Sequence, residues 1–133
     1  MKSFVICLKK GDEAISELIS FCHKNEIQSG WFSGLGAAQS AKLAIYDLDK
    51  KEYIRKEVSG ILEILSYTGN ISLLGDKTIV HSHVTLSDET FAAFGGHVDE
   101  LTIAATCEIV LHSLDIELIR KFDEGIGLNL LEL

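Results

Sequence analysis

The sequence predicts an α+β domain in which one main helix accompanies a mostly antiparallel sheet. Three observations predict it. The chain has 133 residues, close to the commonest size of a single domain. Only one segment repeats its apolar residues at helical spacing, and most of the rest alternates with the period of two that strands show. We count about eight short strands, enough for the sheet to close on itself.

The helix is expected over residues 12–25, after a first strand at residues 3–9. Gly11, Asp12 and Glu13 supply a helix start, because acidic side chains favour the positive end of the helix dipole. Apolar residues then recur on one face, at Ile15, Leu18, Ile19 and Cys22.

The period changes to two after the helix. Residues 30–47 are expected to form two strands joined by a segment of small residues, and residues 47–51 a turn. Gly69-Asn70 predicts a tight hairpin turn. Further strands are expected within residues 78–88, 101–111 and 115–122. No linker or repeat divides the chain, so we predict a single domain over residues 1–133.

The charge argues against a nucleic-acid binder. There are 20 acidic and 12 basic residues, a net charge of −8, whereas phosphate binding requires an excess of Lys and Arg. The one local exception is a basic hairpin formed by Lys50, Lys51, Arg55 and Lys56. Glu52 and Glu57 adjoin it, which favours a solvated hairpin. Any contact with DNA is expected there, and DNA binding by the chain alone is doubtful.

The chain is expected to be cytoplasmic, without a membrane partner. Its first apolar run, Phe4 to Leu8, is too short for a signal peptide, and nothing approaches the about 18 apolar residues of a membrane span. The three cysteines are Cys7, Cys22 and Cys107. They are odd in number and lie in apolar segments, so we interpret them as reduced core residues.

His81 and His83 are the strongest candidates for chemistry. They lie two apart in an expected strand, so both side chains leave the same face, about 6.6 Å apart along the chain. Val80, Val84 and Leu86 take the opposite, core-facing side. Two imidazoles placed in this way can converge on one metal ion.

His97 is the natural third ligand. It follows Gly95-Gly96, where the absence of side chains would let two strands approach closely. The expected cofactor is one divalent metal, with Zn²⁺ foremost, and the alternative is three histidines with a structural role. The fourth ligand would be water, a carboxylate such as Glu63, or a group from a neighbouring subunit. Glu63 alternates with Ile61 and Leu65, and a half-buried structural carboxylate is its other interpretation.

Five segments in order resemble the stand-alone prokaryotic members of the PPC (plant-and-prokaryote-conserved) domain family. They are Gly34-Leu35-Gly36-Ala37-Ala38 with the LAIYD that follows, then GILEILSYTGNIS at 60–72, HSHVTLSD at 81–88, FGGHV at 94–98 and TCEIVL at 106–111. The resemblance extends from about residue 4 to 122.

The resemblance implies a PPC-like fold that assembles as a homotrimer. Plant members carry AT-hook segments that hold DNA, and the family is labelled DNA-binding and transcription-associated on that basis. This chain has no Arg-Gly-Arg hook, and residues 60–65 lack the Arg-Phe of the plant proteins. Similar His pairs occur in the stand-alone prokaryotic members. The expected function is therefore an oligomeric binding or regulatory module with a three-histidine metal site, acting on an unknown protein partner or small ligand. The alternative is a metal-dependent enzyme that acts on a small molecule at the histidine cluster.

Overall fold

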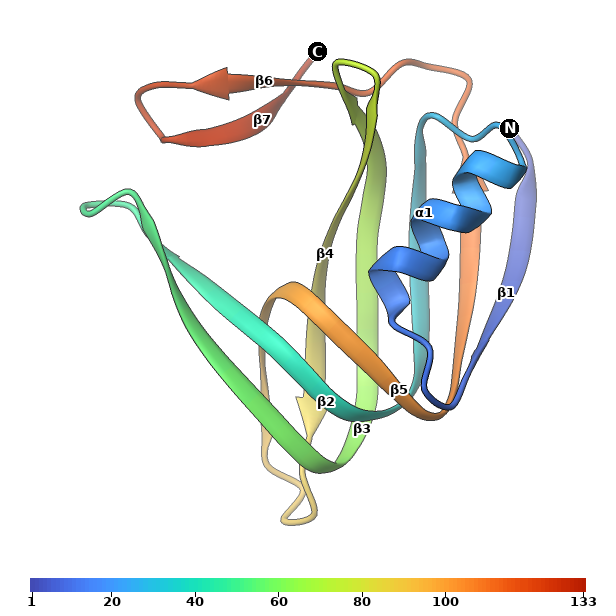
Figure 1. Cartoon of the computed structure of the whole chain (residues 1–133), viewed down its shortest axis with the longest axis vertical. Helices are drawn as coiled ribbons and strands as arrows, with labels where there is room; N and C mark the ends of the chain where they lie inside the picture. The colour runs from blue at the N-terminus through green and yellow to red at the C-terminus, as the bar shows by residue number, and fades with distance from the viewer.

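A computed structural model describes all residues 1–133. It shows one helix packed on a seven-stranded sheet (Figure 1). The α+β class with a mostly antiparallel sheet is thus confirmed. The elements are β1 (Ser3–Lys9), α1 (Ala14–Lys24), β2 (Gly30–Asp47), β3 (Glu52–Leu74), β4 (Lys77–Ser87), β5 (Ala93–Ser113), β6 (Ile119–Asp123) and β7 (Leu128–Glu132).

The sheet closes on itself through four strands. β2 pairs with β3, β3 with β4, β4 with the start of β5, and the rest of β5 with β2, all antiparallel. β1 extends the sheet beyond β5. β6 joins β3 through one parallel pair, Leu73 with Ile119, and carries β7 as a hairpin that projects at one end of the molecule (Figure 1).

Fewer and longer strands replace the expected eight short ones. Residues 30–47 form one strand, β2, rather than a pair of strands. Register shifts between Gly34 and Gly36 and between Ala38 and Ser40 let it bend without a turn. Glycine is required here because a Cβ on Gly36 would lie 2.0 Å from the carbonyl oxygen of Thr106. The small-residue segment is therefore a bend in a continuous strand.

The turn predicted at Gly69-Asn70 is wrong. Both residues lie inside β3, where Asn70 pairs with His81 of β4. A Cβ on Gly69 would lie 2.3 Å from the carbonyl oxygen of His81 and 2.7 Å from the ring of Phe32. This glycine makes room for a close approach between neighbouring chain segments. The hairpin between β3 and β4 turns at Gly75-Asp76.

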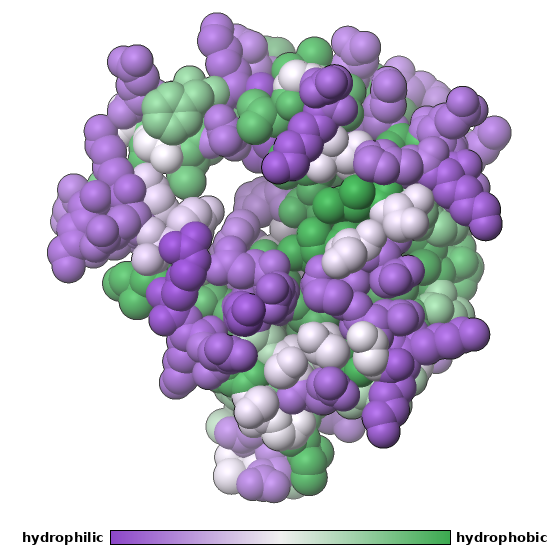
Figure 2. Space-filling model, in the orientation of Figure 1, coloured by the Kyte–Doolittle hydropathy of each residue, from purple (hydrophilic) through white to green (hydrophobic).

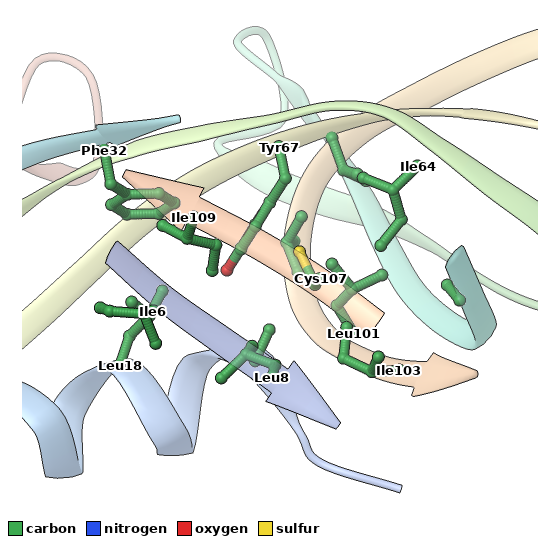
Figure 3. Packing of buried hydrophobic residues seen from close by; sticks show 14 of the residues in the cluster. Ile6, Leu8, Leu18, Phe32, Ile64, Tyr67, Leu101, Ile103, Cys107 and Ile109 are labelled. Atoms are coloured by element: carbon green, nitrogen blue, oxygen red, sulfur yellow. The ribbon is translucent and has the colours of Figure 1, made fainter. Parts of the chain in front are cut away.

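The predicted helix is confirmed, with slightly shorter bounds. Its N-cap is Glu13, whose carboxylate accepts hydrogen bonds from the backbone amides of Ile15 and Ser16. Leu18 and Cys22 are buried in the core together with residues of β1, β2, β3 and β5. Figure 3 shows Leu18 directed at Ile6 of β1. The eleven-residue helix is too short to cross a membrane, and the chain has no other helix.

Two of the three cysteines occupy the core as expected. Cys22 and Cys107 are fully buried, and burial raises the pKa of each thiol to about 11, so both stay protonated. Cys7 is exposed, contrary to its interpretation as a core residue, because it lies on the outer side of β1 opposite Glu108.

Candidate metal centre

Three histidines from two adjacent strands meet on one face of the sheet. His83 of β4 pairs directly with His97 of β5, and His81 precedes His83 by one full strand period. One ring nitrogen of each histidine lies within 4.8 Å of those of the other two. The ring centroids are 5.1 to 5.6 Å apart. The structure therefore brings together all three histidines that the sequence singled out.

The strand period explains this placement. Val84 and Leu86 are buried on the core side of β4, so His81 and His83 are directed to the opposite side. Gly95 lets β5 lie close to β4, because a Cβ on it would be 2.0 Å from the carbonyl oxygen of Val84. The core and the glycine together fix the register that sets His83 opposite His97.

His97 has an unpaired buried nitrogen. Its Nδ1 atom is inaccessible to solvent and has no hydrogen-bond partner. Buried polar atoms without a partner are uncommon because they lose their hydrogen bonds to water. A metal ion bound to Nδ1 would satisfy this atom. Neutral imidazole nitrogens are common zinc ligands, so the chemistry of the three side chains suits such an ion.

Asp99 faces the other nitrogen of the same ring. Its Oδ1 lies 3.7 Å from Nε2 of His97, and its Oδ2 accepts a hydrogen bond from Nε of Arg55 at 3.0 Å. Metal-bound histidines usually direct their second ring nitrogen at a carboxylate, which fixes the tautomer and the ring orientation. The residues present therefore fit a metal ion.

The ring of Tyr53 supports His97 from one side. The two rings are stacked with centroids 5.0 Å apart, and the guanidinium of Arg55 lies over the ring of Tyr53, 5.1 Å from its centroid. A strand face that carries Tyr53 and Arg55 thus holds both His97 and its carboxylate neighbour in place. These contacts restrict the rotation of the imidazole.

Burial keeps two of the imidazoles neutral. It lowers the pKa of His81 to about 4, and the positive charge of Arg120 and the two neighbouring histidines add to the effect. Burial also lowers the pKa of His97, although Asp99 opposes the shift. Neutral imidazole is the form that binds metal ions.

Glu63 does not join the histidines. It is exposed rather than half-buried, and it pairs with Ser87, four residues beyond His83 along β4. It is not among the groups whose ligand atoms converge. The buried residues of this part of β3 are its neighbours Leu62 and Ile64.

The basic hairpin is confirmed: Lys50 and Lys51 lie in the turn between β2 and β3, and Arg55 and Lys56 lie at the start of β3. Three of its four basic side chains have partners within the chain. Arg55 is bonded to Asp99, and Nζ of Lys50 lies 4.0 Å from Asp47. Nζ of Lys51 donates a hydrogen bond to the carbonyl oxygen of Glu124. Lys56, the fourth basic residue, is exposed.

Sequence reasoning missed Asp99 and Arg120. Asp99 had a local signal, because His97-x-Asp99 in a strand places both side chains on one face. Arg120 had none, since it reaches the site from β6 through a pairing between strands distant in sequence. Its Nη2 atom lies 3.4 Å from Nδ1 of His81.

A pocket adjoins the cluster. It has a volume of about 320 Å³ and lies between the β6–β7 hairpin, the end of β3 and the strands that carry His81 and His97. Figure 2 shows an opening in this region, between the hairpin at the top and the projecting end of β2 and β3. Its wall is mostly apolar, with Arg120, Tyr53 and the two histidines as its main polar side chains.

Several solved structures match nearly the whole chain, among them those of three proteins. A metal-containing protein from Archaeoglobus fulgidus is 34% identical, with a TM-score of 0.93, and the match covers 100% of this chain and 94% of that one. A plant- and prokaryote-conserved protein from Pyrococcus horikoshii is 30% identical, with a TM-score of 0.93 and coverage of 100% and 92%. A protein from Bacteroides thetaiotaomicron, described as a candidate DNA-binding protein, is 25% identical, with a TM-score of 0.94 and coverage of 98% and 91%.

No curated protein is detectably similar in sequence. The family model that describes the Plants and Prokaryotes Conserved (PCC) domain, the PPC family of the resemblance above, matches residues 1–115. With that match over most of its length and three solved relatives at 30% identity or more, the chain belongs to the PPC domain family.

Proposed function

We propose that His81, His83 and His97 hold one divalent metal ion. Two observations carry the proposal: one ring nitrogen of each histidine lies within 4.8 Å of those of the other two, and Nδ1 of His97 is buried without a partner. The description of the Archaeoglobus fulgidus relative as metal-containing supports it. His81 and His83 come from β4 and His97 from β5, so the ligands rest on rigid elements.

Zn²⁺ is the metal we propose. Three neutral imidazoles suit zinc, copper, nickel and iron, and affinity alone does not select among them, so availability decides. No cysteine belongs to the cluster, and Cys107 is fully buried in the core with its thiol protonated. Three protein ligands leave a fourth position for water or a ligand, as in catalytic rather than structural zinc sites.

The proposed role of the domain is an oligomeric PPC-type binding or regulatory module, with a homotrimer as the assembly. An apolar outer face of the sheet supports assembly. It is formed by large side chains that are at least 41% exposed and come from β1, β2, β3 and β5: Val5, Trp31, Leu35, Leu65 and Val110. Apolar patches of this kind mark surfaces that another subunit covers.

A metal-dependent enzyme is the second candidate, and the pocket favours it. An open coordination position beside a pocket of about 320 Å³ would let a small molecule reach the metal. In such an enzyme the metal would act as a Lewis acid or would activate a bound water molecule. His97 would be held by Asp99 and Tyr53, and Arg120 would orient the ligand.

Binding to DNA by the chain alone is not part of the proposal. Some relatives are described as candidate DNA-binding proteins. The charge of −8 opposes it, as do the internal contacts of Lys50, Lys51 and Arg55. A DNA-associated role would therefore need a partner that supplies the phosphate contacts.

The metal proposal is tested by titrating metal-free protein with Zn²⁺ in competition with a chelating dye. The wild type is expected to bind one ion per chain. His81→Ala and His97→Ala are expected to lose at least about tenfold in affinity, because each removes one of three ligands. The matched control is His112→Ala, in the same strand as His97 but bonded to Ser3 at 2.9 Å, and it should bind as the wild type. Equal affinities in all four proteins would refute the site.

A further inference from the structure

Arg120 is a buried cation without a carboxylate partner. The residue is only 9% exposed. Nε donates to Oγ of Ser72 at 2.7 Å, Nη1 to the carbonyl oxygen of Asn129 at 3.0 Å, and Nη2 to Oδ1 of Asn70 at 2.8 Å. All three acceptors are neutral, and none of the chain's ion pairs includes Arg120. A buried charge is costly unless an opposite charge accompanies it.

The fourth contact of this guanidinium cannot persist once His81 binds a metal. Nη2 lies 3.4 Å from Nδ1 of His81 and needs a lone pair there. A neutral imidazole has one nitrogen with a lone pair and one with a proton. If the metal binds Nδ1, the lone pair is used. If the metal binds Nε2, Nδ1 carries the proton and cannot accept. In both cases an N–H of Arg120 is released.

The guanidinium lines the pocket beside the histidines. A guanidinium has five N–H donors, of which three are bonded to Ser72, Asn129 and Asn70, so two remain once His81 is a ligand. The opposing walls are apolar and include Ile79, Leu128 and Leu130. The volume of the pocket, about 320 Å³, is near the lower limit of the volumes that ligand pockets have. The pocket thus offers one positive charge in an apolar setting.

We propose that this pocket binds a small organic carboxylate, with its carboxylate on Arg120 and its apolar body against Leu128 and Leu130. A single negative charge matches the single cation, and two N–H donors match the two oxygens of a carboxylate. A phosphate dianion would bring more charge than one arginine compensates, and it has no apolar part for the walls. The proposal rests on the proposed metal site only for the release of the second N–H.

The test uses butyrate as the probe, titrated against full-length protein by ligand-observed NMR. Zinc content is measured in each sample. Zinc-loaded wild type is expected to bind butyrate at least about tenfold more tightly than the uncharged butanamide, because charge-assisted hydrogen bonds are the stronger ones. It should also prefer butyrate to inorganic phosphate. Zinc-free protein should bind butyrate more weakly than zinc-loaded protein.

Two variants separate recognition from folding. Arg120→Gln should weaken butyrate binding at least about tenfold, but it also removes contacts that anchor β6. Leu130→Glu leaves the hydrogen bonds of Arg120 intact and sets a negative charge at the pocket wall, so it should weaken butyrate and spare butanamide. The matched control is Leu133→Glu, the same substitution near the end of the same hairpin, at a residue that is 96% exposed. It should bind as the wild type.

The outcomes distinguish the two proposals. Three results on zinc-loaded protein would each overturn the carboxylate site. The first is equal affinity for butyrate and butanamide, and the second is higher affinity for phosphate than for butyrate. The third is an unchanged butyrate affinity in Arg120→Gln or in Leu130→Glu. A protein that holds no zinc but still binds butyrate through Arg120 would refute the metal site and leave the carboxylate site standing. Equal butyrate affinity with and without zinc would refute the link between the two.

Discussion

His83 and His97 lie directly opposite each other in the antiparallel pairing of β4 and β5, with ring centroids 5.6 Å apart. Because strand side chains alternate between faces, this pairing also brings His81 to the same surface. A shift of the register by one residue would place His97 on the face opposite to His81 and His83. The metal site therefore depends on the close contact between these two strands.

Gly95→Ala tests that dependence. The new Cβ would lie 2.0 Å from the carbonyl oxygen of Val84, so β4 and β5 must separate. We expect the free energy of unfolding to fall by about 1–3 kcal/mol and zinc affinity to fall with it. Gly125→Ala is the control, because only the side chain of Asp123 lies near its Cβ. Chemical denaturation measures the first effect, and a zinc titration of the folded fraction the second. Unchanged zinc affinity in Gly95→Ala would contradict the register argument.

The stability of the metal-free protein should decrease as the pH is lowered from about 6.5 to about 4. The pKa of His81 is about 4 in the folded protein and ordinarily 6.5. Between these values the unfolded chain takes up a proton that the folded chain does not, so protonation favours unfolding. The stabilisation from neutral His81 is present above pH 6.5 and is lost towards pH 4.

Thermal unfolding of metal-free protein across this pH range gives the measurement. His81→Gln should flatten the dependence, because it removes the titrating ring. His112→Gln should retain it. A melting temperature that does not change between pH 6.5 and pH 4.5, in the wild type, is the result that this account does not allow.

The protein is expected to be a trimer of 14.6 kDa chains. Leu35→Glu, on the apolar outer face, should dissociate it, because a charge would have to be buried in the interface. Leu48→Glu is the control, at a residue that is comparably exposed but lies in the turn between β2 and β3. Light scattering coupled to size-exclusion chromatography measures the mass of the assembly. A monomeric wild type at micromolar concentration would contradict the assembly.

Duplex DNA should bind negligibly at physiological salt. Non-specific binders typically show dissociation constants of about 10⁻⁴ to 10⁻⁶ M there. A chain with a charge of −8 should not bind more tightly than this. Fluorescence anisotropy at 150 mM salt is the assay. Sub-micromolar binding that Lys51→Glu or Arg55→Glu weakens would refute the expectation and place the contact at the basic hairpin.

The sequence predicted the helix and the histidine cluster because both depend on local spacing. The helix follows from apolar residues on one face, and the cluster from His-x-His together with a glycine pair before His97. The third ligand could be chosen because glycines allow strands to approach closely, and Gly95 does lie against Val84. These signals lie within a few residues of the feature they predict.

The strand boundaries were less predictable because glycine occurs both in turns and inside strands where another segment packs closely. Gly69 reads as a turn in the sequence, yet it lies inside β3 because Phe32 packs against its backbone. Gly34 and Gly36 mark a bend rather than a strand end. Arg120 escaped prediction for another reason. Its place beside His81 is set by the pairing of β6 with the far end of β3, which no local pattern encodes.

The metal content of the protein is the most direct test of the account. Protein purified without an affinity tag, incubated with Zn²⁺ and dialysed, should retain one ion per chain by elemental analysis. His83→Ala should retain less than about a tenth of this amount while its circular dichroism matches the wild type, because Val84 and Leu86 still fill the core side of β4. A wild type that retains no metal, or a His83→Ala variant that retains as much as the wild type, would contradict the metal site.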